Sequence, residues 1–112
     1  MTSIPPTDAS TGIERREFHR RKLHEVLEIE WGSSTLTGMV RDIHQRGLFV
    51  ELMPPLWVGA TFSARLMVNP ILQLNCTVRR VEPGKGNGVT FDLPEEGGKA
   101  QLEILLVTLP KV

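Results

Sequence analysis

"LQLNCTVRRVEPGKGNGVTFDL", residues 72–93, is the stretch of the chain that decides the fold class. Apolar and polar residues alternate in its first half, as expected for a strand with one buried face. The apolar positions are Leu72, Leu74, Cys76 and Val78, and the polar positions are Gln73, Asn75, Thr77 and Arg79. The glycine-rich residues 83–88 are typical of a tight hairpin loop, and residues 89–93 then form the returning strand. The chain therefore contains an antiparallel strand pair.

Four earlier segments also have the character of strands and are separated by turn residues. They are residues 23–31, 34–43, 47–52 and 60–68, all rich in branched and aromatic side chains. Together with the hairpin they predict about six strands. Short strands at regular spacing, with turn signals between them, favour a small barrel or a sandwich.

Near the end of the chain the apolar residues recur with the periodicity of a helix, not that of a strand. Leucine recurs at the spacing i, i+3, i+4, i+7, which places the side chains on one face of a helix. The positions are Leu102, Leu105, Leu106 and Leu109. Packing against the barrel is the simplest role for this face, although part of it could form a dimer contact. Glu95 and Glu96 lie where acids favour a helix start, and the two glycines after them could delay it.

Composition sets limits on the class of protein. The 112 residues suffice for one domain with a single hydrophobic core. Basic and acidic residues balance at 13 each, which argues against a general nucleic-acid coat protein but leaves room for a local basic site. A single cysteine excludes an internal disulfide, and Cys76 is expected to be a small buried apolar residue.

The chain divides into three expected regions. Residues 1–12, rich in Pro, Ser and Thr, predict a disordered tail, residues 13–22 a flexible arginine arm, and residues 23–112 the barrel with its helix. No apolar stretch approaches the roughly 20 residues that cross a bilayer, and the N-terminus lacks the pattern of a secretory signal. We therefore expect a cytoplasmic protein without membrane insertion.

The arginine arm contains the first candidate binding residues. They are Arg15, Arg16, Arg20 and Arg21. A guanidinium group is a rigid fork of donors that matches phosphate oxygens and the O6/N7 edge of guanine. Two such forks on one flexible segment could close on a compact ligand with two charges. Taken alone, however, the segment fits a solvated charge run better.

A second candidate lies between two predicted strands, in "DIHQRG" at residues 42–47. Asp42 could accept hydrogen bonds from the N1 and N2 edge of a guanine. Gly47 suits a sharp turn with a positive φ angle. Taken alone, Asp42 is better explained as a residue that caps the turn by bonding to nearby backbone amides.

The two segments together resemble the PilZ domain family. The family signature is RxxxR, followed after a strand pair by (D/N)xSxxG. Arg16 and Arg20 match the first motif, and Asp42 and Gly47 match the outer positions of the second. His44 departs from the pattern because it stands where the family has serine. With six strand signals and a closing helix, the resemblance covers most of the chain.

This resemblance implies an all-β fold, a six-stranded antiparallel PilZ-type barrel with a C-terminal helix. It also implies a receptor and adaptor, not an enzyme, whose ligand is cyclic di-GMP and which needs no cofactor or metal. Binding would fold the arm onto the barrel and present a new surface to a protein effector. The effector class that the family suggests is bacterial motility, pilus, biofilm or exopolysaccharide machinery.

The same resemblance implies a role for each motif residue. Arg16 and Arg20 would clamp the ligand, with Arg15 or Arg21 assisting them. Asp42 would take a guanine edge, and Gly47 would keep the turn close to the ligand. His44 is larger than serine and could either stack on a guanine or block it, and it could gain charge near a phosphate.

Two other functions compete with the receptor. The exchange of serine for His44 raises the alternative of an altered PilZ domain that binds no nucleotide and acts as a protein-interaction module. A nucleic-acid binder that uses the basic arm is the weakest reading, because the chain is neutral overall and acids are frequent around its early strands.

The remaining candidate sites have simpler explanations. His19 and His24 lack further ligands at metal-binding spacing, and no nucleophile with an acid–base pair is visible. The glycine-rich loop at 83–88 lacks the spacing of a phosphate-binding loop. Trp31 is expected in the core. Trp57 could be an exposed partner anchor, but core packing is the favoured interpretation.

Overall fold

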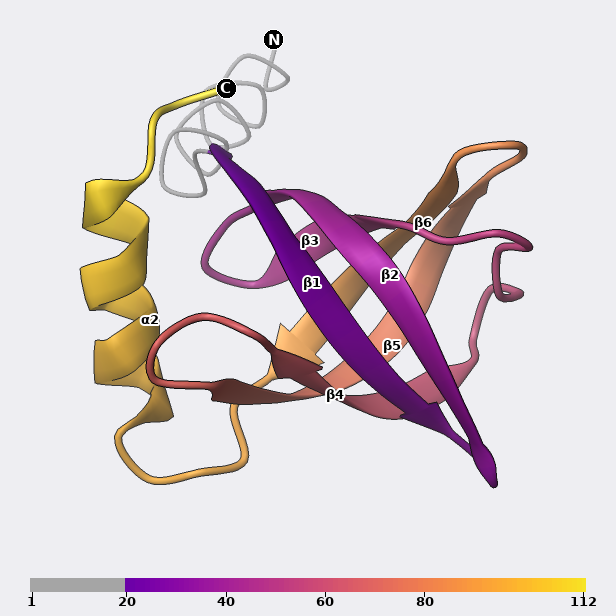
Figure 1. Ribbon diagram of the computed structural model, residues 1–112, viewed down its shortest axis with the longest axis horizontal. Helices are drawn as coiled ribbons and strands as arrows, with labels where there is room; N and C mark the ends of the chain where they lie inside the picture. Colours follow the sequence, from indigo (N-terminus) through magenta and orange to yellow (C-terminus); the bar gives the residue numbers. More distant parts are fainter. Residues whose placement is uncertain (1–19) are drawn as a thin grey trace, which may run out of the picture.

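The computed structural model describes residues 20–112, which form six strands and one helix (Figure 1). In chain order these are β1 (Arg21–Trp31), β2 (Ser34–Ile43), β3 (Gly47–Glu51), β4 (Thr61–Leu66), β5 (Leu72–Glu82), β6 (Gly86–Asp92) and α2 (Gly98–Thr108). The expected tail at 1–12 and most of the expected arm, residues 13–19, lie outside the described residues.

The six strands form a closed barrel in the order β1-β2-β3-β6-β5-β4. Every pair of neighbours is antiparallel. Closure joins the first strand to the fourth, so each of the six described strands has a hydrogen-bonded neighbour on both sides. The predicted six-stranded antiparallel barrel with a C-terminal helix is confirmed.

The barrel interior is filled by the apolar half of each alternating strand. The four apolar positions predicted in β5, including Cys76 and Val78, are buried as expected. Burial raises the pKa of the Cys76 thiol to about 12, so the thiol stays protonated and acts as a small apolar side chain. The hairpin pattern therefore predicted correctly which face of β5 turns inward.

The hairpin loop is shorter than the sequence pattern indicated. β6 already begins at Gly86, so only residues 83–85 connect the strands and the expected loop at 83–88 is too long. Gly86 pairs with Glu51 of β3, and a Cβ atom on Gly86 would overlap the backbone oxygen of Val50. Glycine occurs here because two strands approach closely, not only because the chain turns.

Helix α2 lies beside the barrel and packs its leucines against it (Figure 1). Leu102 and Leu106 are buried, and Leu105 and Leu109 pack against the core, as the leucine spacing predicted. The helix begins only at Gly98, after the left-handed Gly97, so neither Glu95 nor Glu96 falls within its first turn. The following residues return toward the start of the barrel.

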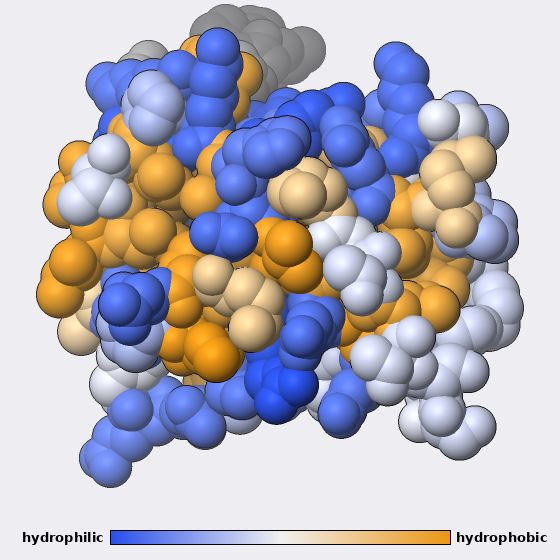
Figure 2. Space-filling model, in the orientation of Figure 1, coloured by the Kyte–Doolittle hydropathy of each residue, from blue (hydrophilic) through white to orange (hydrophobic). Residues whose placement is uncertain are grey.

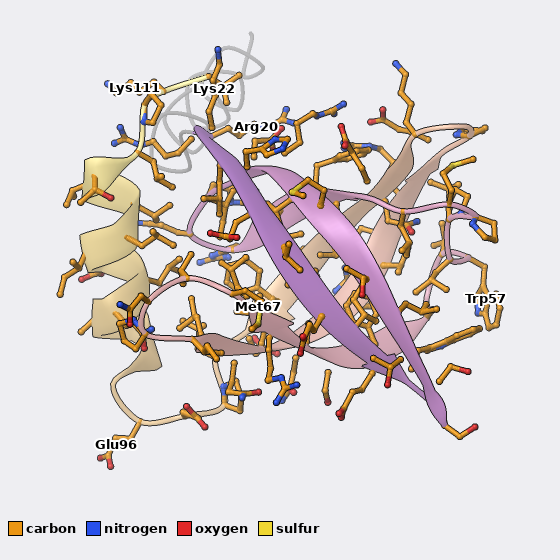
Figure 3. The ribbon with its side chains drawn as sticks, in the orientation of Figure 1. Arg20, Lys22, Trp57, Met67, Glu96 and Lys111 are labelled. Atoms are coloured by element: carbon orange, nitrogen blue, oxygen red, sulfur yellow. The ribbon has the colours of Figure 1, made fainter. Side chains whose placement is uncertain are left out.

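The C-terminal residues pair with the start of β1. The amide of Lys22 donates to the oxygen of Pro110 at 2.8 Å, and the amide of Val112 donates to the oxygen of Arg20 at 3.1 Å. Lys22, Arg20 and Lys111 lie close together in Figure 3. Arg21 and Lys22 also pair with Ile43 and Asp42 of β2, so they belong to β1, and the boundary expected between residues 22 and 23 lies inside a strand.

The two tryptophans meet at the other end of the barrel. Trp31 is half-buried against the core, and its ring meets that of Trp57 edge-on, with the centroids 4.7 Å apart. Trp57 is nevertheless 62% exposed, so the favoured interpretation that it packs in the core is wrong (Figure 3). Its neighbour Leu56 turns inward instead.

Candidate ligand-binding site

Arg20 and Asp42 come from two segments 22 residues apart and meet on the outside of the barrel. Arg20 immediately precedes β1, and Asp42 lies near the end of β2, directly opposite Lys22. The guanidinium of Arg20 donates from Nε to Oδ1 at 3.3 Å and from Nη2 to Oδ2 at 3.0 Å. Asp42 is thus held by a two-pronged ion pair in a strand, and the interpretation that it merely caps a turn is not supported.

The ion pair is unequally exposed. The side chain of Asp42 is only 8% exposed, whereas that of Arg20 is 48% exposed. Arg41 adds a weaker attraction, with its Nε 3.7 Å from Oδ2 of Asp42. Because one partner faces solvent, the pair itself contributes only about 1 kcal/mol or less to stability. Departure of Arg20 would have a modest cost only if other donors took its place at the almost buried carboxylate of Asp42.

The turn between β2 and β3 is closed by His44 and Gly47. The amide of His44 donates to the oxygen of Gly47 at 2.8 Å, and the amide of Arg46 donates to Nδ1 of His44 at 3.1 Å. Gly47 does not adopt the positive φ angle that the sequence predicted. It opens β3, and a Cβ atom there would overlap the oxygen of Val89 in β6. Close strand contact explains this glycine.

The surroundings of His44 favour its neutral form. Burial lowers the pKa of the imidazole below 6.5, and the positive charge of Arg20 lowers it further. The carboxylate of Asp42 raises the pKa, but less strongly. Because Nδ1 accepts a hydrogen bond, the neutral ring carries its proton on Nε2.

A single row of cross-strand partners connects Asp42 to the far side of the sheet. The row runs through β1, β2, β3, β6 and β5 as Lys22, Asp42, Phe49, Gly88 and Arg80. Directly opposed residues lie about 5 Å apart, so five strands contribute to one continuous strip of the outer surface. Phe49 is only 1% exposed although it lies outside the core cluster of the barrel.

Two bulges place extra arginines beside this row. The register shifts in β2 between Val40 and Asp42, and in β5 between Val78 and Arg80, so the additional residues are Arg41 and Arg79. The guanidinium carbon of Arg41 lies 4.0 Å from the ring centroid of Phe49, and that of Arg80 lies 5.9 Å from it. Arginines therefore cover the buried ring from the solvent side.

A pocket of about 200 Å³ opens along the strip, and we call it the outer pocket. It is lined by Arg20, Asp42, His44, Leu48, Phe49, Arg79, Arg80, Gly88, Val89 and Thr90. Gly88 has no side chain to fill the space between Phe49 and Arg80. Three guanidinium groups and one carboxylate line the pocket, which favours a negatively charged ligand. Figure 2 shows hydrophilic side chains gathered along the edge of the molecule near the start of β1.

Arg79 and Arg80 are the functional candidates that sequence reasoning missed. Arg79 was assigned only to the polar face of its strand, and Arg80 was not singled out. Two adjacent arginines interrupt the strict alternation of β5, and this interruption was the available signal for a bulge. The tertiary structure carries both of them to the wall opposite Arg20.

Not every predicted residue joins the outer pocket. Arg21 instead donates from Nη1 to the oxygen of Leu109 at 3.3 Å, at the end of α2. Arg15 and Arg16 lie outside the described residues. Among residues 20–112, no group of three or more His, Cys, Asp or Glu side chains could hold a metal ion. In the same range, no helix is long and apolar enough to cross a membrane.

Comparison with known proteins identifies the family of this chain. The family model described as PilZ domain matches residues 14–107. The chain belongs to the PilZ domain family. PilZ domains are generally adaptors that bind cyclic di-GMP, and they are generally not enzymes. The match includes Arg16, Arg20, Asp42 and Gly47, the residues that carry the two motifs.

A solved structure supports the fold of this PilZ domain. The crystal structure of the PilZ domain of CeSA from a cellulose-synthesizing bacterium superimposes with a TM-score of 0.63 at 18% sequence identity. The alignment covers 80% of this chain and 96% of the other. A search of curated proteins finds no match.

Proposed function

We propose that this PilZ domain is a cyclic di-GMP receptor and adaptor whose arginine arm folds onto the barrel when the ligand binds. The observation that carries the proposal is the meeting of Arg20 and Asp42 at the rim of the outer pocket. These residues come from the two separate motifs, and their contact supports a site in which a guanidinium fork suited to phosphate lies next to a carboxylate suited to guanine.

The ligand would exchange partners with the ion pair. Arg20 turns from Asp42 to a phosphate or to the O6/N7 edge of a guanine, and the carboxylate then accepts hydrogen bonds from N1 and N2 of a guanine. Neutral His44 offers a flat ring and one N–H donor where serine would offer a hydroxyl. Because the carboxylate is almost buried, the guanine must replace Arg20 with equivalent donors, which selects for this base.

The outer pocket, at about 200 Å³, is smaller than the pockets of about 300–1,000 Å³ that typically enclose small-molecule ligands. The ligand therefore needs further cover, and we assign it to the arm, where Arg15 and Arg16 add two guanidinium groups. Arg21 is a weaker candidate because its guanidinium already bonds to Leu109. Ordering a segment costs about 2–5 kcal/mol, and charge-assisted hydrogen bonds at about 1.5–3 kcal/mol each would offset it.

The folded arm would present a new surface to a protein effector of the motility, pilus, biofilm or exopolysaccharide machinery. A receptor for a second messenger of this kind acts in the cytoplasm, and the single buried cysteine suits that reducing compartment. The proposal includes neither a nucleic-acid partner nor membrane insertion.

One observation favours the altered PilZ domain as a second candidate. His44 lines the outer pocket, and its ring occupies space that a serine would leave open. If the imidazole blocks the guanine, the Arg20–Asp42 pair stays closed and the domain acts through protein contacts alone.

Calorimetric titration with cyclic di-GMP decides between the two candidates. The wild-type domain should bind with micromolar or tighter affinity, and GTP should give no comparable heat. Arg20→Ala should abolish or strongly weaken binding. Arg65→Ala is the matched control, because Arg65 lies on β4, pairs with Glu28 and does not line the outer pocket. Absence of binding by the wild-type domain at high micromolar ligand would refute the receptor and leave the interaction module.

A further inference from the structure

The wall of the outer pocket opposite Arg20 has the composition of a binding surface. It is formed by Arg79 and Arg80 of β5 together with Gly88 and Thr90 of β6. A regular strand would turn two adjacent residues to opposite faces of the sheet. The bulge between Val78 and Arg80 lets both arginines lie on the outside of the barrel, where both line the pocket. Bulges commonly redirect side chains in this way at functional sites.

Each of the two guanidinium groups is oriented by a neighbour. Arg79 donates from Nε to Oγ1 of Thr90 at 3.0 Å. This bond uses only Nε, and within residues 20–112 the two terminal nitrogens of Arg79 form no other hydrogen bond. Arg80 is held by Glu82, with Nε and Nη2 at 3.1 and 3.0 Å from the same carboxylate oxygen. Neither arginine has to be ordered from a fully free state when a ligand arrives.

Gly88 keeps the surface beside Arg80 open. A Cβ atom on Gly88 would lie 3.2 Å from Cζ of Arg80, so any side chain there would press on the guanidinium. The glycine allows the flat group to lie against the backbone of β6, between Phe49 and the pocket. A flat cation in this position can stack on a planar base, and the fork of Arg79 next to it can bind an anion or a guanine edge.

We propose that Arg79 and Arg80 form a second arginine clamp for the bound cyclic dinucleotide, on the wall opposite Arg20. Arg79 donates hydrogen bonds to a phosphate or to the O6/N7 edge of a guanine, and Arg80 stacks on a base. The inference rests on the proposed receptor function and adds specificity-determining residues that lie outside both sequence motifs. Within residues 20–112, Arg20 pairs with Asp42 and Arg80 with Glu82, so Arg79 is the lining arginine whose positive charge is not balanced by an ion pair.

The test is a calorimetric titration of the full chain with cyclic di-GMP, using Arg79→Ala, Arg79→Lys and Arg80→Ala. One lost charge-assisted hydrogen bond corresponds to a drop in affinity of roughly 10- to 100-fold, which we expect for Arg79→Ala. Arg79→Lys should recover only part of the loss, because an ammonium group retains the charge but not the fork. Arg65→Ala should bind like the wild type.

Thermal melting of each variant shows whether the fold is intact. If Arg79→Ala does not fold, Thr90→Val provides a second test, since it removes the hydroxyl that orients Arg79 and keeps the arginine itself. We expect Thr90→Val to weaken binding several-fold.

The outcomes separate this inference from the proposed function. If the wild type binds, Arg20→Ala fails to bind, and both β5 variants bind as tightly as Arg65→Ala, the second clamp is refuted and the receptor stands. If the wild type does not bind cyclic di-GMP, both proposals fall together. If the β5 variants lose affinity while their melting temperatures are unchanged, the second clamp is established.

Discussion

Asn87 is a buried polar residue of β6, next to Gly88 of the outer pocket. Its side chain is 1% exposed and forms three hydrogen bonds to backbone groups. The oxygen accepts from the amide of Leu56 at 2.8 Å, and the nitrogen donates to the oxygens of Leu56 at 2.8 Å and Arg80 at 3.2 Å. One side chain thus connects the loop between β3 and β4 to β5, the strand that carries Arg79 and Arg80.

The variant Asn87→Ala removes all three bonds. The two groups of Leu56 are buried, and each buried backbone group left without a partner costs about 1–3 kcal/mol. The bond to Arg80 is partly exposed, so its loss adds less. We therefore expect the free energy of unfolding to fall by about 3 kcal/mol. For a domain of this size, that corresponds to a decrease in melting temperature of roughly 12–24 °C.

Asn75→Ala is the matched control for this prediction. Asn75 is also an asparagine in the barrel wall, but its side chain is exposed on β5. Thermal melting and urea unfolding of both variants against the wild type measure the difference. Asn75→Ala should change the free energy of unfolding by about 0.5 kcal/mol or less. Equal losses for the two variants would show that the hydrogen bonds of Asn87 do not stabilise the barrel as argued.

Two further predictions concern the turn that borders the outer pocket. His44 has a lowered pKa in the folded domain, so the unfolded chain takes up its proton more readily, and stability should fall as the pH drops below 6.5. The melting temperature should differ less between pH 7.5 and pH 5.5 for His44→Gln than for the wild type. An equal difference for both proteins would contradict a lowered pKa of His44 in the folded domain. Gly47→Ala should lower the free energy of unfolding by about 1–3 kcal/mol, because the new methyl group overlaps the oxygen of Val89, and urea unfolding measures it. If Gly47→Ala were as stable as the wild type, β3 and β6 could move apart to make room for the methyl group without loss of stability.

Much of the fold follows from local patterns that are visible in the sequence. The alternation in residues 72–78 identifies the buried face of β5, because a strand turns successive side chains to opposite sides. The leucine spacing identifies the packed face of α2, because three or four residues complete one helical turn. Motif spacing likewise singled out Arg20 and Asp42, which the barrel brings into contact.

Other features could not be predicted because they depend on contacts between distant strands. The positions of Gly47 and Gly86 are explained by the backbones of β6 and β3, not by a local turn. Whether Trp57 lies inside or outside depends on which residue of its loop fits the end of the barrel. The outward positions of Arg79 and Arg80 arise from a bulge whose register is set by pairing with β6.

The sequence by itself therefore determined the barrel class, the closing helix and one half of the candidate site, since each of these is encoded in neighbouring residues. Only the tertiary structure decided that Arg20 bonds to Asp42 and that two arginines of β5 stand on the opposite wall of the outer pocket. The physical reason is that strand register, set by pairing across five strands, decides which distant side chains share one face of the sheet.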